Sequence, residues 1–158
     1  MTSQPKPKLL LKKSLLQSVH NAIGTPLFRN LYIELDGKES DALKDGDLSC
    51  AVFVSGILAM FGLIDEGHAT VDTTVKYLKE AGWFETDLAS SPEAGDVIVW
   101  EQVDYADGPH KHIGFYIGNH FAISNNDKLK SPQQHDWTFD NTRQPSFLLR
   151  YDFDKPKP

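Results

Sequence analysis

Hydrophobic residues in the first half of the chain follow the spacing of helices. They recur on one helical face between residues 10 and 23, and Gly24 then marks a helix end. Residues 49–63 are apolar almost throughout, and because this run is too long for a strand, it predicts a helix buried on nearly all sides. Residues 70–81 are amphipathic and end at Gly82, so they predict a third helix.

The second half of the chain carries the alternation and the turn signals of strands. Residues 96–100 follow a turn that contains Pro and Gly, and they predict a strand. Residues 112–117 and 120–124 flank a Gly-Asn turn and predict a hairpin, and residues 147–153 predict a last strand. Helices that precede an antiparallel sheet indicate an α+β fold.

The chain is expected to form one domain. Residues 9–153 contain no repeat and no internal linker, whereas residues 1–8 and 154–158 are rich in Pro and Lys and predict flexible tails. Residues 31–35 predict a short extended segment, and the polar, acidic residues 36–47 predict a surface loop. A chain of 158 residues can bury a core of its own, and we expect a monomer.

Charge and composition limit the classes of partner and the location that we expect for this protein. The formal net charge is -6 and there is no long basic run, so nucleic acid is not an expected partner. No stretch approaches the roughly 20 apolar residues that span a bilayer, and no secretory signal is visible near the N-terminus. We therefore expect a soluble protein without a membrane span, cytoplasmic as expressed unless it is released to act on a cell wall. The sequence has no Gly-rich phosphate loop or dinucleotide fingerprint, so no organic cofactor is expected.

Cys50 is the single cysteine of the chain, which excludes an intramolecular disulfide and a tetrathiolate zinc site. It falls in the first turn of the predicted buried helix, where unpaired N–H groups and the helix dipole stabilise an anion. A thiol pKa can fall well below its usual value at such a place. Cys50 is therefore a candidate nucleophile, and the alternative is a small buried hydrophobic residue.

A thiol nucleophile needs a base, and histidine is the usual one. Of six histidines, His112 is the best placed, because it begins a predicted strand that would hold its imidazole rigidly. A metal-dependent hydrolase is a rival interpretation, in which His110 and His112 bind a metal together with His120 or His135. Since neither an HExxH motif nor a paired Cys motif is present, the thiol mechanism is favoured.

Three segments in order resemble the NlpC-type and CHAP families of peptidoglycan hydrolases. They are the Ser-Cys-Ala-x-Phe-Val segment around Cys50, the Gly-Asp-x-x-x-Trp segment that ends at Trp100, and the His-x-Gly-x-Tyr-x-Gly segment that begins at His112. The similarity covers roughly residues 45–127. It implies a papain-like core, with Cys50 as nucleophile and His112 as base.

The resemblance also implies a third polar residue that orients the imidazole from the strand after His112. Counting as in the NlpC branch places Ser124 there, and counting as in the CHAP branch favours Asn125. We select Asn125, because an asparagine can accept from the imidazole N–H, as in Cys-His-Asn proteases. Asp127 is a further alternative if the strand bulges. Ser124 is then expected to contact substrate.

Two more residues are expected to contact substrate. Ser49 stands where the NlpC branch often has aspartate, and Asp96 begins the Gly-Asp strand. The alternative for Asp96 is a local cap of the turn that precedes it. The three tryptophans could line a sugar-binding groove, although tryptophan is more often part of the core.

The function predicted from these residues is hydrolysis of an amide bond through an acyl-enzyme on Cys50. The resemblance favours peptidoglycan as substrate, cleaved either by a stem-peptide endopeptidase or by an N-acetylmuramoyl-L-alanine amidase. One alternative is a non-catalytic binding module on the same fold. Another is a cysteine hydrolase or toxin that acts on a different acyl substrate.

Overall fold

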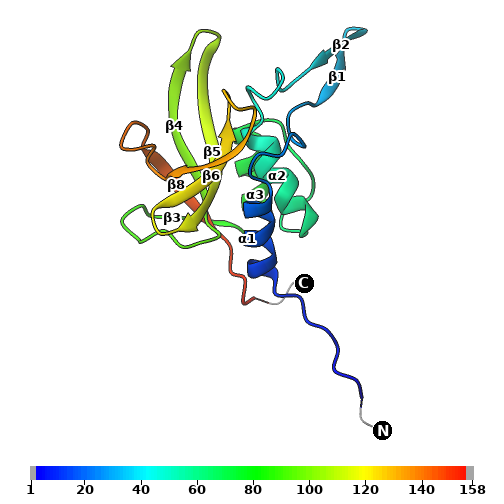
Figure 1. The fold of residues 1–158 in the computed structure, drawn as a ribbon, viewed down its shortest axis with the longest axis vertical. Helices are drawn as coiled ribbons and strands as arrows, with labels where there is room; N and C mark the ends of the chain where they lie inside the picture. The colour runs from blue at the N-terminus through cyan, green and yellow to red at the C-terminus, as the bar shows by residue number, and fades with distance from the viewer. Residues whose placement is uncertain (1–2, 156–158) are drawn as a thin grey trace.

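The structure, a computed structural model, describes residues 3–155, so the predicted tails are covered only in part, and residues 1–2 and 156–158 lie outside it. Three helices precede a six-stranded antiparallel sheet (Figure 1). The helices are α1 (Leu11–Asn21), α2 (Cys50–Met60) and α3 (Val71–Glu80). This arrangement confirms the α+β class.

The helices lie where the hydrophobic pattern predicts them. Helix α2 buries most of its surface, as expected for an almost wholly apolar run. Ser49 occupies its N-cap position, but its side chain makes no capping hydrogen bond. Helix α3 is capped by Thr70, whose hydroxyl accepts from the backbone N–H of Thr73 at 3.2 Å. Within the described residues no helix is long and apolar enough to cross a membrane.

The main sheet has the strand order β3-β8-β4-β5-β6-β7. Its strands are β3 (Phe84–Thr86), β4 (Val97–Tyr105), β5 (Gly108–Gly118), β6 (Phe121–Asn126), β7 (Ser131–Asp136) and β8 (Pro145–Arg150). Strands β4 and β5 extend beyond their neighbours as one long hairpin (Figure 1). The predicted strand at residues 96–100 is therefore only the inner half of β4.

Three further segments differ from the sequence prediction, and one of them is β3, since no strand was predicted at residues 84–86. The predicted loop at residues 36–47 contains a strand, β2 (Lys38–Asp41), which pairs with β1 (Tyr32–Leu35) in a separate hairpin. Strand β7 was not predicted, because its sequence Ser-Pro-Gln-Gln-His-Asp is polar and includes a proline. Pro132 is tolerated there because β7 is an edge strand, with a single neighbour in the sheet.

The three helices cover one face of the sheet (Figure 1), and the main core fills the space between them. Phe53 of α2 packs edge-on against Phe115 of β5 with ring centroids 5.6 Å apart. A smaller cluster on the other face is built around Trp100, which is fully buried. Burial on both faces explains why the centre of β4 reads as a continuous apolar run.

Candidate active site

Cys50 is the first residue of α2 and is partly buried against the main core. Its enclosure by protein raises the pKa of the thiol, and the backbone N–H groups of Ile113 and Ala51 and the charge of Arg143 oppose that rise. The net direction corrects the expectation that the helix start alone would lower the thiol pKa. At neutral pH the thiol is therefore protonated before substrate binds.

His112 lies on β5, directly before the residue whose N–H approaches the Cys50 sulfur. Its imidazole packs against the rings of Trp100 and Phe139, at centroid distances of 5.2 Å and 5.8 Å. Burial lowers the pKa of His112 to about 3, with smaller contributions from the charges of Arg143 and His135. The imidazole is therefore neutral at pH 7, which is the form that can accept a proton.

Cys50 and His112 line the same cavity, which has a volume of about 820 Å³. Its walls come from the start of α2, the start of α3, the long β4–β5 hairpin and strands β6 and β7. No hydrogen bond joins the thiol to His112 within the described part of the chain. Catalytic hydrogen bonds are often long before substrate binds, so the cavity places the two groups without yet pairing them.

A chain of hydrogen bonds runs from His112 across two strands. Nε2 of His112 lies 2.8 Å from Oγ of Ser124, and the same Oγ lies 2.7 Å from Nε2 of His135. Nδ1 of His135 lies 2.7 Å from the backbone carbonyl oxygen of Asp136. The chain thus connects β5, β6 and β7 and ends on a backbone group that can only accept.

That carbonyl determines where every proton in the chain lies. Nδ1 of His135 must donate to it, and since burial lowers the pKa of His135, the ring is neutral and its Nε2 is an acceptor. The hydroxyl of Ser124 then donates to His135 and accepts from Nε2–H of His112. The remaining nitrogen of His112, Nδ1, carries a lone pair and no proton. The imidazole is held in a tautomer that can act as a base.

Gly114 allows this chain to close. A Cβ at position 114 would lie 2.7 Å from the Cβ of Ser124 and 2.8 Å from the carbonyl oxygen of Ile123. It would also lie 3.0 Å from the ring of Trp100. A glycine two residues after His112 therefore lets β5 and β6 approach closely enough for Ser124 to reach the imidazole.

Asn125 was expected to orient His112, and the structure gives that hydrogen bond to Ser124 instead. Successive residues of β6 point to opposite faces of the sheet, so only one of the two can meet the imidazole. The buried Asn125 amide donates to the carbonyl oxygen of Gly46 at 2.8 Å. It ties β6 to the loop that leads into Cys50. The further alternative, Asp127, is an exposed residue in the turn after β6.

Ser49 was predicted to contact substrate, but it does not line this cavity. The Ser49 side chain is buried at 1% exposure, and its hydroxyl has no hydrogen-bond partner among the described residues. Ser49 is thus a buried neighbour of the nucleophile with an unsatisfied polar atom.

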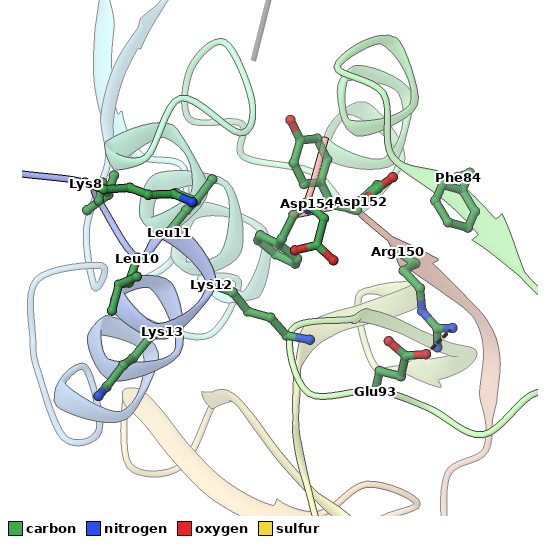
Figure 2. A pocket seen from close by; sticks show the side chains of 13 residues that line it. Lys8, Leu10, Leu11, Lys12, Lys13, Phe84, Glu93, Arg150, Asp152 and Asp154 are labelled. Atoms are coloured by element: carbon green, nitrogen blue, oxygen red, sulfur yellow. Dashed lines mark hydrogen bonds and ion pairs between the residues drawn. The ribbon is translucent and has the colours of Figure 1, made fainter. Parts of the chain in front are cut away.

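Asp96 is also absent from the cavity lining. Its buried carboxylate accepts from Arg150 at 2.7 and 2.8 Å and from the backbone N–H of Glu93 at 2.8 Å. Arg150 and Glu93 pair at the edge of a second cavity of about 480 Å³, between the start of α1 and the segment after β8 (Figure 2). Neither Cys50 nor His112 lines this second cavity. Asp96 therefore belongs to a structural ion-pair cluster. This role resembles the alternative interpretation of Asp96, in which it caps the local turn.

Three of the histidines proposed as metal ligands have other partners, and the fourth, His120, does not line the cavity. His110 pairs with Asp107 at 2.9 Å, while His112 and His135 share Ser124. Among residues 3–155 the one group of at least three side chains that could hold a metal ion is the cluster Asp65, Glu66 and His68, which does not line the cavity. The tryptophans do not line it either; Trp83 and Trp100 are buried, and each donates its indole N–H to a backbone carbonyl.

Two residues of the site were not found by the sequence analysis in these roles. His135 was considered only as a metal ligand, because the polar strand that carries it was not recognised. Arg143 lies in the turn between β7 and β8 and reaches the cavity through the fold alone. The sequence signal available for His135 was its place in a polar, Pro-containing segment after the predicted hairpin. For Arg143 there was no local signal.

A scan against models of known protein families found no match for this chain, and a search of curated proteins found none either.

Proposed function

We propose that this protein is a cysteine hydrolase on a papain-like core, with Cys50 as nucleophile and His112 as base. The observation that carries the proposal is the hydrogen-bond chain from His112 through Ser124 and His135 to a backbone carbonyl. This chain leaves Nδ1 of a neutral imidazole unprotonated in the cavity that also contains the thiol. A general base needs this arrangement, because only a ring nitrogen without a proton can accept one from the thiol.

The reaction begins with proton transfer from the Cys50 thiol to Nδ1 of His112 as sulfur attacks the carbonyl carbon of an amide. The backbone N–H groups at the start of α2 have no partner within the helix and are suited to bind the oxyanion. The carbon–nitrogen bond then breaks, and the imidazolium returns its proton to the leaving amine. Water, deprotonated by His112, hydrolyses the thioester and restores the thiol.

Ser124 acts as the orienting residue in this scheme. When His112 becomes an imidazolium, its Nε2–H continues to donate to Ser124, whose own hydroxyl proton is directed to His135. The dipoles of the chain therefore point their negative ends toward the developing charge. A serine supplies no full negative charge, so it stabilises the imidazolium less than a carboxylate would.

The substrate class follows from the resemblance of the Cys50, Trp100 and His112 segments to the NlpC-type and CHAP hydrolases. We propose an amide bond of peptidoglycan, either within the stem peptide or between the peptide and the glycan. A non-catalytic binding module is the second candidate, and the observation that favours it is the Cys50 thiol, whose pKa is raised and which forms no hydrogen bond with His112 among the described residues.

Digestion of purified peptidoglycan tests the proposal. The wild-type protein and the variants Cys50→Ser, His112→Ala and His20→Ala are incubated with peptidoglycan, and the soluble fragments are identified by mass spectrometry. His20 is an exposed histidine of α1 and provides the matched control. We expect the wild type and His20→Ala to release fragments, and the other two variants to release none. New termini within the peptide identify an endopeptidase, and release of whole peptides identifies an amidase.

Two outcomes would contradict the proposal. Equal fragment release by the wild type and by Cys50→Ser would exclude a thiol nucleophile. Retention of peptidoglycan by the wild type in a pull-down, with no new termini, would instead support the binding module.

A further inference from the structure

The cavity that contains Cys50 also contains Arg143, whose charge is balanced by no carboxylate among the described residues. Its Nε donates to the backbone carbonyl of Glu101 at 3.0 Å, and its Nη2 donates to the backbone carbonyl of His110 at 2.8 Å. Its Nη1 lies 3.4 Å from the hydroxyl of Tyr105. All three acceptors are neutral. A guanidinium has five N–H groups, so two of them remain for a ligand.

The lysines of the same cavity are each paired with an aspartate. Lys111 lies 2.6 Å from Asp72, and Lys44 lies 2.9 Å from Asp107. Both pairs are exposed, and in each pair the aspartate neutralises the charge of the lysine. Arg143 is thus the cation of the described cavity lining that stays available for an anion from outside the chain.

No carboxylate among the described residues forms an ion pair with Arg143. The side chain of Glu101 accepts from the backbone N–H of Gln144 at 3.0 Å and forms no ion pair with Arg143. Asp127 lines the cavity from the turn after β6 and forms no ion pair with Arg143 in the described part of the chain. The guanidinium is held in place by neutral acceptors on the β4–β5 hairpin, so little entropy is lost when it binds a planar anion.

Arg143 also lies close to the reacting groups. It lines the same cavity as Cys50 and His112, and its Nη2 donates to the carbonyl of His110, two residues before His112 on β5. Consistent with this position, its charge lowers the pKa of both the Cys50 thiol and the His112 imidazole. An anion bound to Arg143 would therefore lie in the cavity that contains the thiol. In a substrate that places its scissile carbonyl on Cys50, the anion would belong to a group near the cleaved bond.

We propose that Arg143 forms a subsite for a substrate carboxylate next to the scissile amide, so that the enzyme acts on peptides that carry a free carboxylate at this place. The inference rests on the proposed function, since it uses Cys50 as the point from which the subsite is located. A bidentate pair between a guanidinium and a carboxylate supplies both affinity and direction. The subsite therefore sets which amide of a peptide is presented to sulfur.

Alkylation of Cys50 by two small reagents tests the subsite without knowledge of the substrate. Iodoacetate carries a carboxylate, and iodoacetamide is its neutral counterpart. Both react with the thiolate, so the ratio of their rates is independent of the thiolate fraction. Cys50 is the single cysteine, and intact mass spectrometry reports its modification alone. The rates are measured at about pH 8.5, where a model thiol is half ionised.

We expect Arg143→Gln to lower the ratio of the iodoacetate rate to the iodoacetamide rate by about threefold to tenfold. Arg143→Lys keeps the charge and is expected to keep most of the preference, which separates loss of charge from loss of folding. Lys111→Gln removes an equal charge from the same cavity, but one that is already paired, and is expected to leave the ratio nearly unchanged. An unchanged ratio in Arg143→Gln, or an equal fall in Lys111→Gln, would overturn the subsite.

The outcomes for the subsite and for the hydrolase are separate. If peptidoglycan is digested while the ratio does not depend on Arg143, the hydrolase stands and the subsite is wrong. If the ratio depends on Arg143 while no peptidoglycan is digested, the subsite stands beside the thiol and peptidoglycan is the wrong substrate.

Discussion

The Nε2 atom of His112 lies 2.8 Å from the Oγ atom of Ser124, across the pairing of β5 with β6. Ser124 is buried at 1% exposure, so this hydrogen bond is shielded from water and competes with no solvent. It makes the serine hydroxyl, rather than the neighbouring asparagine amide, the group that decides the orientation of the imidazole. The properties of the candidate site then depend on what Ser124 itself contacts.

Replacing His135 by phenylalanine should change the tautomer of His112. The variant keeps a ring to stack on Phe139, whose centroid lies 3.9 Å from that of His135, but it removes the acceptor of the Ser124 hydroxyl. Ser124 is then free to donate to Nε2 of His112, which moves the imidazole proton to Nδ1. Nitrogen-15 shifts of the imidazole report the tautomer directly. A tautomer that is unchanged in the variant would show that His135 serves only packing.

Ser124→Ala and Asn125→Ala should have different effects. Loss of the Ser124 hydroxyl leaves Nε2 of His112 and Nε2 of His135 without a partner, so we expect the rate of peptidoglycan cleavage to fall at least about tenfold. Loss of the Asn125 amide breaks its bond to Gly46, so we expect a loss of about 1 kcal/mol in the free energy of unfolding and a smaller loss in rate. Cleavage rates and urea denaturation compare the two. The reverse ranking of the rates would return Asn125 to the orienting role.

Asp96→Asn should destabilise the fold without changing the site. The Asp96 carboxylate is 2% exposed and binds Arg150, so its removal leaves a poorly compensated guanidinium and costs about 3 kcal/mol. Glu93→Gln breaks the exposed ion pair of the same arginine and should lower the free energy of unfolding by less than about 1 kcal/mol. Thermal unfolding measures both. If Asp96→Asn instead abolished cleavage at a temperature where it is folded, Asp96 would have a role in the reaction.

The stability of the protein should fall with acid partly because of His112. Its pKa is about 3 in the folded protein and near 6.5 when unfolded, so between these values the unfolded chain binds a proton that the folded chain does not. The free energy of unfolding contributed by this group is therefore complete above about pH 6.5 and declines by up to about 1.4 kcal/mol per pH unit on acidification. His112→Gln should remove this part of the slope, and His20→Gln, on an exposed position, should not. Equal slopes in the two variants, measured by denaturation between pH 4 and pH 7, would contradict the lowered pKa.

Ser49→Ala should stabilise the protein or leave it unchanged. The Ser49 hydroxyl is buried without a hydrogen-bond partner among the described residues, and such a group costs about 1–3 kcal/mol. We expect a gain of about 1 kcal/mol in the free energy of unfolding, with unchanged alkylation of Cys50. A loss of stability would mean that the hydroxyl has a partner in solution.

The three helices and the central strands of the sheet could be predicted from the order of the residues, because periodicity is a local property. The apolar run after Ser49 predicts α2, and it places Cys50 at the helix start, where the structure also has it. The Gly-Asn turn predicts the hairpin that carries His112. The glycine at position 114 was visible too, although its reason, the close approach of Ser124, was not.

The partners of the site residues were decided by the tertiary structure. Whether Ser124 or Asn125 meets the imidazole depends on the register of β5 with β6, and a shift of one residue exchanges the two faces. His135 lies in the site because its strand pairs with β6 at the edge of the sheet. An edge strand does not require hydrophobic periodicity, so the sequence pattern did not reveal it. The direction of the Cys50 pKa shift followed from burial, which the helix position alone does not reveal. Sequence spacing therefore determined which residues were candidates, and packing between distant strands determined which of them touch.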